Sequence, residues 1–278
     1  MGSERSRKKN IKKYMRTKRP ASKIPHRNKV EGPGIWVSCV KGKEKQTVGE
    51  LYDLFESLAD VLYPPSEMKD GVDGEGDQDE DLETAMAKEI AELNKPRNEH
   101  RFVNCRINAP CTIFFAVKPP IDPVRLVSAH IDEVNRTGIT HTKFVHVFRF
   151  SPVWDTCAAT LPDIVRLAER LLPPAFDSDP PRPFKYRIQL STRNHNALAR
   201  EELYPALAKC VPIDRGHSVD IEHAELVILV ELYMFVCGLS VVRDYDRFRK
   251  FNVNSIAEAA VARGLGDEAD GSGLGLNR

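Results

Sequence analysis

The sequence lacks the short motifs that identify several large classes of enzyme. No GxxxxGK(S/T) loop is present, which excludes a P-loop nucleotide site, and no GxSxG elbow is present to carry a serine nucleophile. No HxE followed by PCxxC occurs, which argues against a zinc-dependent nucleobase deaminase. The GSGLG near the C-terminus precedes no predicted helix, so it is not a dinucleotide-binding loop. We therefore expect no catalytic site of these classes.

The cysteines and histidines show no pattern of a metal site. No CxxC pair occurs, and no cysteine stands beside a histidine at the spacing of zinc ligands. Small buried thiols in a reducing compartment are the simplest interpretation of the cysteines. His141 and His146 lie in a predicted turn and strand, where surface histidines are expected rather than ligands. The sequence thus predicts neither a metal ion nor a cofactor. The six cysteines are Cys39, Cys105, Cys111, Cys157, Cys210 and Cys237.

The sequence also lacks a convincing targeting or membrane-spanning segment. The N-terminus is basic but has no apolar core of a signal peptide, and its lysine-rich composition disfavours a mitochondrial transit peptide. One apolar stretch, residues 226–242, contains Glu231, which would cost about 2.5 kcal/mol or more inside a bilayer. Its valine and isoleucine content favours two buried strands instead. We expect no membrane segment.

Charge is nearly balanced overall but strongly separated along the chain. The formal net charge is +1, yet residues 1–30 contain twelve Lys or Arg and one acid, and residues 70–83 contain eight acids and no base. A basic arm over residues 1–32 is expected to be a disordered solubilising tail, a nucleic-acid-binding and nuclear-targeting segment, or both. The acidic run predicts a mobile insertion at about residues 65–84, because so charged a segment does not pack.

The first folded unit is predicted over residues 33–142. Thr47 and Glu50 form a capping-box pattern at the start of one helix, and Asp122 and Gly138 mark the two ends of another. The resulting alternation fits an α/β or α+β layer of ferredoxin-like character, with helices against one sheet face. The predicted elements are a strand at 34–40, helices at 47–64 and 82–94, strands at 100–107 and 111–117, and a helix at 122–138.

A second unit is predicted over residues 143–253, and a flexible glycine-rich tail over residues 254–278. The prolines after residue 172 predict a loop before the next strand. The two apolar segments near the end of the unit would complete a sheet. The predicted elements are strands at 143–153 and 184–191, helices at 161–173 and 197–209, and strands at 217–221, 225–232 and 235–242.

Positive side chains gather along the strand 184–191 and the turn and helix that follow it. Successive strand residues face opposite sides, so the aromatic and aliphatic residues would face the core and the polar ones solvent. Arg200 lies in the first turn of a helix, where the helix dipole favours an anion. Such a surface would bind phosphates with salt-sensitive, largely sequence-independent affinity, whereas the alternative is an ordinary solvated strand face. The candidate residues are Lys185, Arg187, Arg193, Asn194 and Arg200.

Residues from about 100 to 252 resemble THUMP-domain proteins, specifically the eukaryotic adaptors of tRNA acetylation. The RN turn before a basic helix start and the late DY…KFN segment are the more specific parts of the resemblance. It is carried by FRFSPVWDTCAATLPDI (148–164), FKYRIQLSTRNHNALAREEL (184–203), VPIDRGHSVDI (211–221), LVILVEL (226–232) and CGLSVVRDYDRFRKFNV (237–253).

The resemblance implies a ferredoxin-like domain followed by a THUMP domain, which together bind structured tRNA. It further implies a non-catalytic adaptor that presents the D-arm of serine- and leucine-type tRNA to an RNA cytidine acetyltransferase, which makes N4-acetylcytidine. Arg149 and Lys250 would then join the phosphate-binding residues. The basic arm would add non-specific affinity and nuclear import through Lys8, Lys9, Lys12 and Lys13.

Two other functions are also compatible with the sequence. One alternative is a stand-alone tRNA-modifying enzyme with an unrecognised active site, although the chain leaves no room for the catalytic domains usually attached to THUMP domains. Another is a protein scaffold that does not contact RNA. The acidic insertion would either contact the basic acetyltransferase or repel other RNA. A nuclear or nucleolar location is expected, with the cytoplasm as an additional one.

Overall fold

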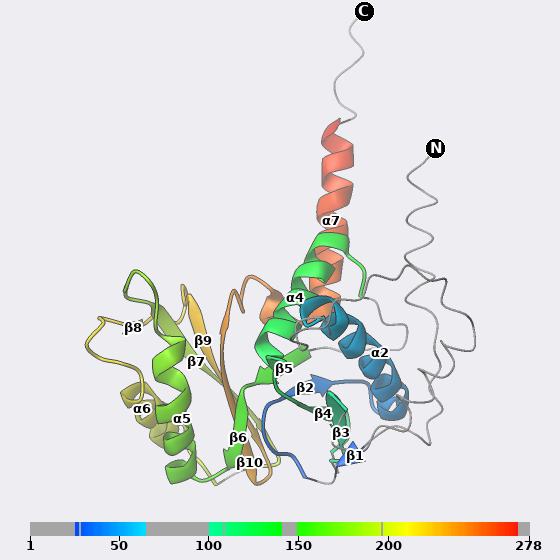
Figure 1. The fold of residues 1–278 in the computed structure, drawn as a ribbon. Coiled ribbons are helices and arrows are strands. Elements are labelled where there is room, and N and C mark those ends of the chain that lie inside the picture. Colours follow the sequence, from blue (N-terminus) through cyan, green and yellow to red (C-terminus); the bar gives the residue numbers. More distant parts are fainter. Residues whose placement is uncertain are drawn as a thin grey trace, which may run out of the picture.

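Two five-stranded sheets, each covered by helices, make up the described part of the protein. Figure 1 shows the sheets beside each other, with the N-terminal unit on the right and the second unit on the left. The basic arm up to residue 25, the acidic insertion and the helix expected at 82–94 lie outside the described residues. The computed structural model describes residues 26–27, 29–64, 100–107, 109–140, 149–195 and 197–271.

The first unit consists, within the described residues, of five strands and two helices. Its strand order is β1-β3-β4-β2-β5, and every neighbouring pair except β1 and β3 is antiparallel. This is the split βαβ arrangement of a ferredoxin-like domain, so the predicted fold is confirmed. The elements are β1 (His26–Arg27), β2 (Gly34–Ser38), α2 (Glu44–Leu62), β3 (Phe102–Cys105), β4 (Thr112–Val117), α4 (Pro123–Thr137) and β5 (Arg149–Val153).

The sequence correctly predicts both ends of α4 but not the start of α2. At α4, Asp122 accepts a hydrogen bond from the Val124 amide at 2.8 Å, and Gly138 closes the helix in the left-handed region, as predicted. The capping box at Thr47 is wrong, because α2 begins earlier and Thr47 lies inside it. Glu44 accepts instead from the Cys111 amide at 3.1 Å, a tertiary contact that no local pattern reveals.

Two expectations about the ends of the first unit also change. The last residues of the basic arm belong to the fold, since His26 pairs with Asn104 and the Gly32 amide donates to Thr156 at 2.9 Å. The predicted start of the second unit at residue 143 lies outside the described residues. The strand that follows, β5, pairs with β2 in the first sheet, and the chain passes to the second sheet at Trp154.

The second unit contains a mixed sheet with the order β6-β10-β9-β7-β8. Strand β7 runs parallel to β9, and the antiparallel pair β9 and β10 confirms the prediction that the apolar stretch forms two buried strands. No helix among the described residues combines the length and apolar character needed to cross a bilayer. The elements are β6 (Asp155–Ala158), α5 (Leu161–Ala175), β7 (Lys185–Arg193), α6 (Arg200–Lys209), β8 (Ser218–Val219), β9 (Leu226–Tyr233) and β10 (Val236–Arg243).

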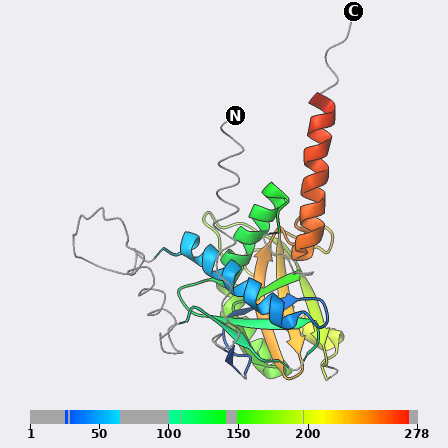
Figure 2. The same cartoon turned by 90° about the vertical axis from the view of Figure 1, so that its right-hand side faces the viewer.

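Residues 253–271 form a helix, α7 (Val253–Gly271), so the expected flexible tail from residue 254 is wrong for its first part. Ile256 and Ala257 are buried in the core beside α4. Arg263 donates to the carbonyl and the side chain of Asn135 at 3.0 and 2.7 Å. The first half of α7 lies along α4, and the rest projects away (Figures 1 and 2). The prediction followed the later glycines and overlooked the apolar residues before them.

The two units share one hydrophobic core. One face of the second sheet packs on α5 and α6, whereas Val227, Leu229 and Val242 on its other face belong to the same cluster as α2 and α4. Tyr233 of β9 reaches the far side of the first sheet, where its ring lies 5.2 Å from Trp36. The central strands of the second sheet are therefore covered on both faces, and Arg187, Glu231 and Ser240 on them are buried.

Candidate nucleic-acid interface

Strand β7 keeps the predicted alternation, but its polar side is not a free surface. Tyr186 and Leu190 are buried against α5 and α6, as expected. Arg187, on the opposite side, is only 8% exposed, so the expected solvent-facing position of this residue is wrong. Two residues of the loop after β10 lie against Arg187: Asp246 forms an ion pair with it, and the ring centre of Tyr245 is 5.8 Å from its guanidinium carbon. The direction of a side chain in a strand could be predicted, but what covers it could not.

The two cations in the N-terminal half of β7 are already paired with carboxylates. Arg187 donates to both oxygens of Asp246 at 2.8 and 2.9 Å and to the Gln189 side chain at 2.9 Å. Lys185 is exposed but bonds to Asp220 at 2.8 Å, and this contact lowers the pKa of Asp220 to about 2. Both positive charges are thus largely compensated within the protein.

The C-terminal end of β7 is different. Arg193 is half-buried and donates from Nη1 to the Thr112 hydroxyl of β4 at 3.1 Å, so it reaches across to the first sheet. Asn194 follows in a left-handed conformation with φ of 52° and is exposed. The adjoining hairpin is attached here, because the Met234 amide donates to the Arg193 carbonyl at 3.1 Å. This end of the strand therefore presents its polar groups at the junction of the two units.

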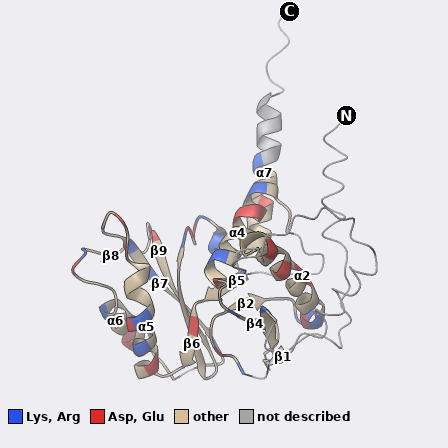
Figure 3. Ribbon diagram, in the orientation of Figure 1, with Lys and Arg blue, Asp and Glu red and all other residues tan. Residues whose placement is uncertain are grey.

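A lysine-rich turn of the first unit lies at the same junction. Lys41, Lys43 and Lys45 are exposed, and none has an ion pair within the described part of the chain. The turn is fixed beside Thr112, because Cys111 accepts from the Cys39 amide at 3.0 Å and donates to Glu44. Figure 3 shows basic residues at one end of α2 and acidic residues along the rest. This KGKEK segment, residues 41–45, was not among the predicted binding residues.

Arg149 and a left-handed turn extend the same surface in the other direction. Arg149 pairs with Ser38 at the end of β2, and the turn η3 (Arg249–Phe251) packs against β5. Arg249, Lys250 and Phe251 all have positive φ, near 51–57°, which costs about 1–2 kcal/mol for each residue with a side chain. Burial of Phe251, with its ring 5.1 Å from that of Tyr245, offsets part of this cost. The turn thereby holds two cations in solvent.

These contacts define one surface that we call the cationic band. It runs from the C-terminal end of β7 past the start of β4 and the end of β2 to the start of β5 and to η3, and so belongs to both units. Of the predicted residues it includes Arg149, Arg193, Asn194 and Lys250. The Lys41–Lys45 turn and Arg249 were missed, although their lysines and arginines are visible in the sequence. The band consists of Lys41, Lys43, Lys45, Arg149, Arg193, Asn194, Arg249 and Lys250.

The remaining predicted residues lie elsewhere. Arg200 is exposed at the start of α6, but Glu201 and Glu202 already occupy the first turn, where the helix dipole favours negative charge. No described contact connects Arg200 to the band. Lys185 and Arg187 lie at the far end of β7. The arm residues Lys8, Lys9, Lys12 and Lys13 lie outside the described residues.

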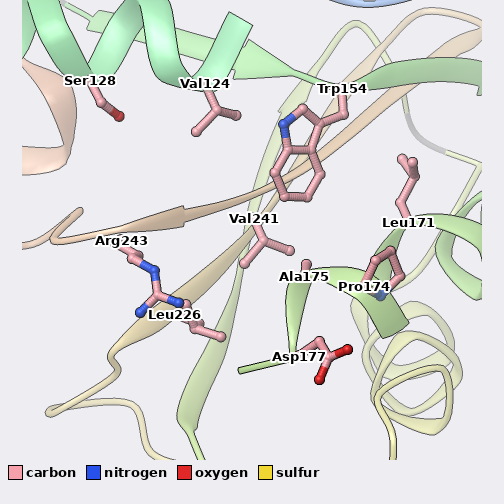
Figure 4. A pocket seen from close by; sticks show the side chains of 10 residues that line it. All are labelled: Val124, Ser128, Trp154, Leu171, Pro174, Ala175, Asp177, Leu226, Val241 and Arg243. Atoms are coloured by element: carbon pink, nitrogen blue, oxygen red, sulfur yellow. The ribbon is translucent and has the colours of Figure 1, made fainter. Parts of the chain in front are cut away.

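A separate cleft of about 570 Å³ opens between α4, the end of α5 and strand β10 (Figure 4). Its walls are mainly apolar, with Arg243 and Asp177 as the charged groups, and the indole of Trp154 projects into it. The indole N–H donates to Asp122 at 3.1 Å, which fixes the ring. The lining does not suit a run of phosphates. Within the described residues, no His, Cys, Asp or Glu cluster could hold a metal ion.

Comparison with known proteins identifies the second unit. The model of the THUMP domain matches residues 158–242. An uncharacterized protein of Schizosaccharomyces pombe is 31% identical over 80% of this chain and 75% of its own length. THUMP domain-containing protein 1 of Bos taurus is 30% identical over 82% of this chain and 64% of its own length. The tRNA acetyltransferase TAN1 of Saccharomyces cerevisiae is 27% identical over 81% of this chain and 85% of its own length. The chain belongs to the family of THUMP-domain proteins that includes these relatives.

Proposed function

We propose that the protein is a tRNA-binding adaptor that performs no covalent step itself. It presents serine- and leucine-type tRNA, through the D-arm, to an RNA cytidine acetyltransferase that forms N4-acetylcytidine. The name of the yeast relative, a tRNA acetyltransferase, supports a place in tRNA acetylation. The proposal includes a nuclear or nucleolar location with a cytoplasmic pool, and RNA contacts from the basic arm.

The cationic band is the observation that carries this proposal. Its lysines and arginines are exposed or half-buried, and the exposed ones have no carboxylate partner within the described residues. A row of such groups releases counterions from a phosphate backbone and binds it with little regard to sequence. Folded RNA is recognised largely in this way, by shape and by contacts to phosphates and 2′-hydroxyls.

The position of the band across both units supports recognition of folded RNA. The groups of the band come from the turn at the start of α2, from β5, from the end of β7 and from η3, and these elements pack on the shared core. A rigid row can match the spacing of phosphates in a structured RNA without being ordered on binding. A flexible single strand gains less from such rigidity, so we expect a preference for folded tRNA over unstructured RNA of equal length.

Direct binding tests the RNA part of the proposal. Purified protein is titrated with serine tRNA in a filter-binding assay at several salt concentrations. The logarithm of the affinity should fall linearly with the logarithm of salt, by about one unit of slope for each phosphate contact. A correctly folded protein without measurable affinity for tRNA would overturn the proposal.

The same yeast relative also favours a second candidate, because its name describes an enzyme. Incubating the protein with tRNA and acetyl-CoA, with and without an RNA cytidine acetyltransferase, separates the two functions. An adaptor gives N4-acetylcytidine, detected by mass spectrometry, only when the acetyltransferase is present. Product formed by the protein alone would establish the enzyme instead.

A further inference from the structure

The turn between β9 and β10 exposes an aromatic side chain to solvent. Tyr233 pairs with Val236 in the strand register, so Met234 and Phe235 form a two-residue turn. Phe235 is 80% exposed, and it is the only exposed Phe, Tyr or Trp among the residues that the structure describes. Met234 beside it is exposed as well. Two apolar side chains therefore stand together at the tip of a hairpin, outside the core.

Stability of the fold does not explain these two residues. Two-residue hairpin turns favour glycine, asparagine and aspartate, because at least one residue of such a turn needs a positive φ. Met234 adopts a φ of 48°, which a residue with a long side chain rarely does. Phe235 gains little from burial at its exposed position. Smaller polar residues would suit the turn better, which indicates a role for the aromatic ring outside the folding of the chain.

Hydrogen bonds hold this turn against the end of β7 that belongs to the cationic band. The Met234 amide donates to the Arg193 carbonyl at 3.1 Å, and the Nδ1–H of His195 donates to the Met234 carbonyl at 2.6 Å. On the other side of the turn, the Ala159 amide donates to the Phe235 carbonyl at 2.8 Å. Both turn residues are thus fixed beside Arg193. The ring of Phe235 therefore stands at the edge of the band.

We propose that Phe235 is an RNA-binding residue that stacks on an unpaired base of the bound tRNA, while the adjacent cationic band holds the phosphates. This inference rests on the proposed tRNA binding and deepens it by assigning a contact to a base. An aromatic ring beside a row of positive charges is the arrangement with which many proteins bind unpaired segments of nucleic acid. Every base has a flat aromatic face, so such a contact tolerates any base sequence.

The surroundings of Phe235 favour a nucleic acid over a protein partner. The centre of a protein interface is depleted in charged residues. The side chains that follow the hydrogen-bonded end of β7 are instead polar: Arg193, Asn194 and His195. An apolar protein surface would deprive such groups of water without replacing its hydrogen bonds. Phosphate and ribose oxygens can accept hydrogen bonds from them while a base covers the ring.

Titration of F235A with two RNAs tests this contact. Filter binding measures the dissociation constants of serine tRNA and of a blunt-ended, fully paired RNA duplex with the same number of nucleotides. F235A should bind tRNA about tenfold more weakly, as expected for the loss of one stacked base, and should bind the duplex like the parent. Because no charge is removed, the salt slope for tRNA should not change, whereas loss of a phosphate-binding lysine lowers it.

Three further variants control for apolar character and for the aromatic face. Ile213 is 84% exposed and lies in the loop before His217, whose ring stacks on Phe184 beside the N-terminal end of β7, away from Arg193. I213A should therefore bind tRNA like the parent. F235W should keep the affinity, and F235L should lose most of it, because leucine is apolar but has no aromatic face. Urea denaturation verifies that each variant is folded, as expected for changes at exposed positions.

The outcomes separate the possible roles of Phe235. Parent-like tRNA affinity in folded F235A overturns the stacking contact, and so does an equal loss of affinity for tRNA and duplex or a parent-like F235L. If F235A keeps its tRNA affinity but no longer co-purifies with an RNA cytidine acetyltransferase, the ring contacts a protein and the proposal is wrong. A parent protein that binds neither RNA overturns the proposed function itself, which keeps the two failures distinct.

Discussion

The two ends of β7 carry the same kinds of residue and differ in what surrounds them. At the N-terminal end, Lys185 and Arg187 are matched by Asp220 and Asp246. At the C-terminal end, Arg193 donates instead to the uncharged Thr112 hydroxyl of the first unit at 3.1 Å. A cation in a strand can therefore either stabilise the fold or bind a partner, depending on which residues of the same chain surround it. Variants at the two ends separate these roles, because they change either the stability or the RNA affinity of the protein.

The largest effect is expected for R187M, and it concerns stability. The variant leaves Asp246 without its bidentate partner, which lowers the free energy of unfolding by about 2 kcal/mol, a moderate value because Asp246 is 44% exposed and can be hydrated. Urea denaturation measures the change. The tRNA affinity of the folded variant should equal that of the parent. A stable R187M with impaired RNA binding would assign Arg187 to the interface after all.

The next effect is expected in the lysine turn, and it concerns affinity. Replacing Lys41, Lys43 and Lys45 together by glutamine should lower the tRNA affinity about tenfold and reduce the salt slope by about three units. The free energy of unfolding should not change, because these side chains make no ion pair within the described part of the chain. Filter binding and urea denaturation of the same preparation test both statements. K185Q, at the other end of β7, is the control and should bind like the parent.

A smaller and opposite pair of effects is expected at Lys250, whose φ is 56°. K250G relieves the left-handed strain and should raise the free energy of unfolding by about 0.5 kcal/mol. It also removes a charge, so the tRNA affinity should fall about twofold. K250Q is the matched control, since it removes the charge and keeps the strain. The two variants should therefore differ in thermal stability and agree in affinity.

The smallest effect is expected for the exposed pair of Lys185 and Asp220. The hydrogen bond from Lys185 lowers the pKa of Asp220 from 3.8 to about 2. A depressed pKa means that the pair stabilises the fold above the ordinary pKa, and that this contribution disappears as the pH falls through the lowered one. D220N should melt slightly below the parent at pH 7, and the difference should vanish toward pH 2. A difference that grows in acid would contradict this assignment.

The sequence predicted the helices and strands better than the contacts between them. Alternation along β7 and the capping of α4 are local signals, and both are confirmed. The start of α2 depends on Glu44 meeting Cys111, and the helical tail depends on Ile256 packing beside α4, contacts between residues far apart in sequence. Local patterns carry no information on such contacts.

The candidate site was predicted in part for the same reason. Arg193 and Asn194 were identified because they follow an amphipathic strand. The lysine turn was overlooked, since its proximity to Arg193 arises only when β4 is placed between them. Arg187 was predicted to face solvent, because no residue near it in the sequence indicates its ion pair with Asp246.

Because the two units share a core, the THUMP domain cannot be separated from the rest of the chain without exposing apolar side chains. Residues 158–242 contain Val227 and Leu229, whose covering residues come from the other unit and from α7. A fragment cut at those limits would expose a broad apolar surface to water and would therefore tend to self-associate. If such a fragment failed to bind RNA, the cause would be its uncovered apolar face, and the result would not show that the domain lacks affinity for RNA.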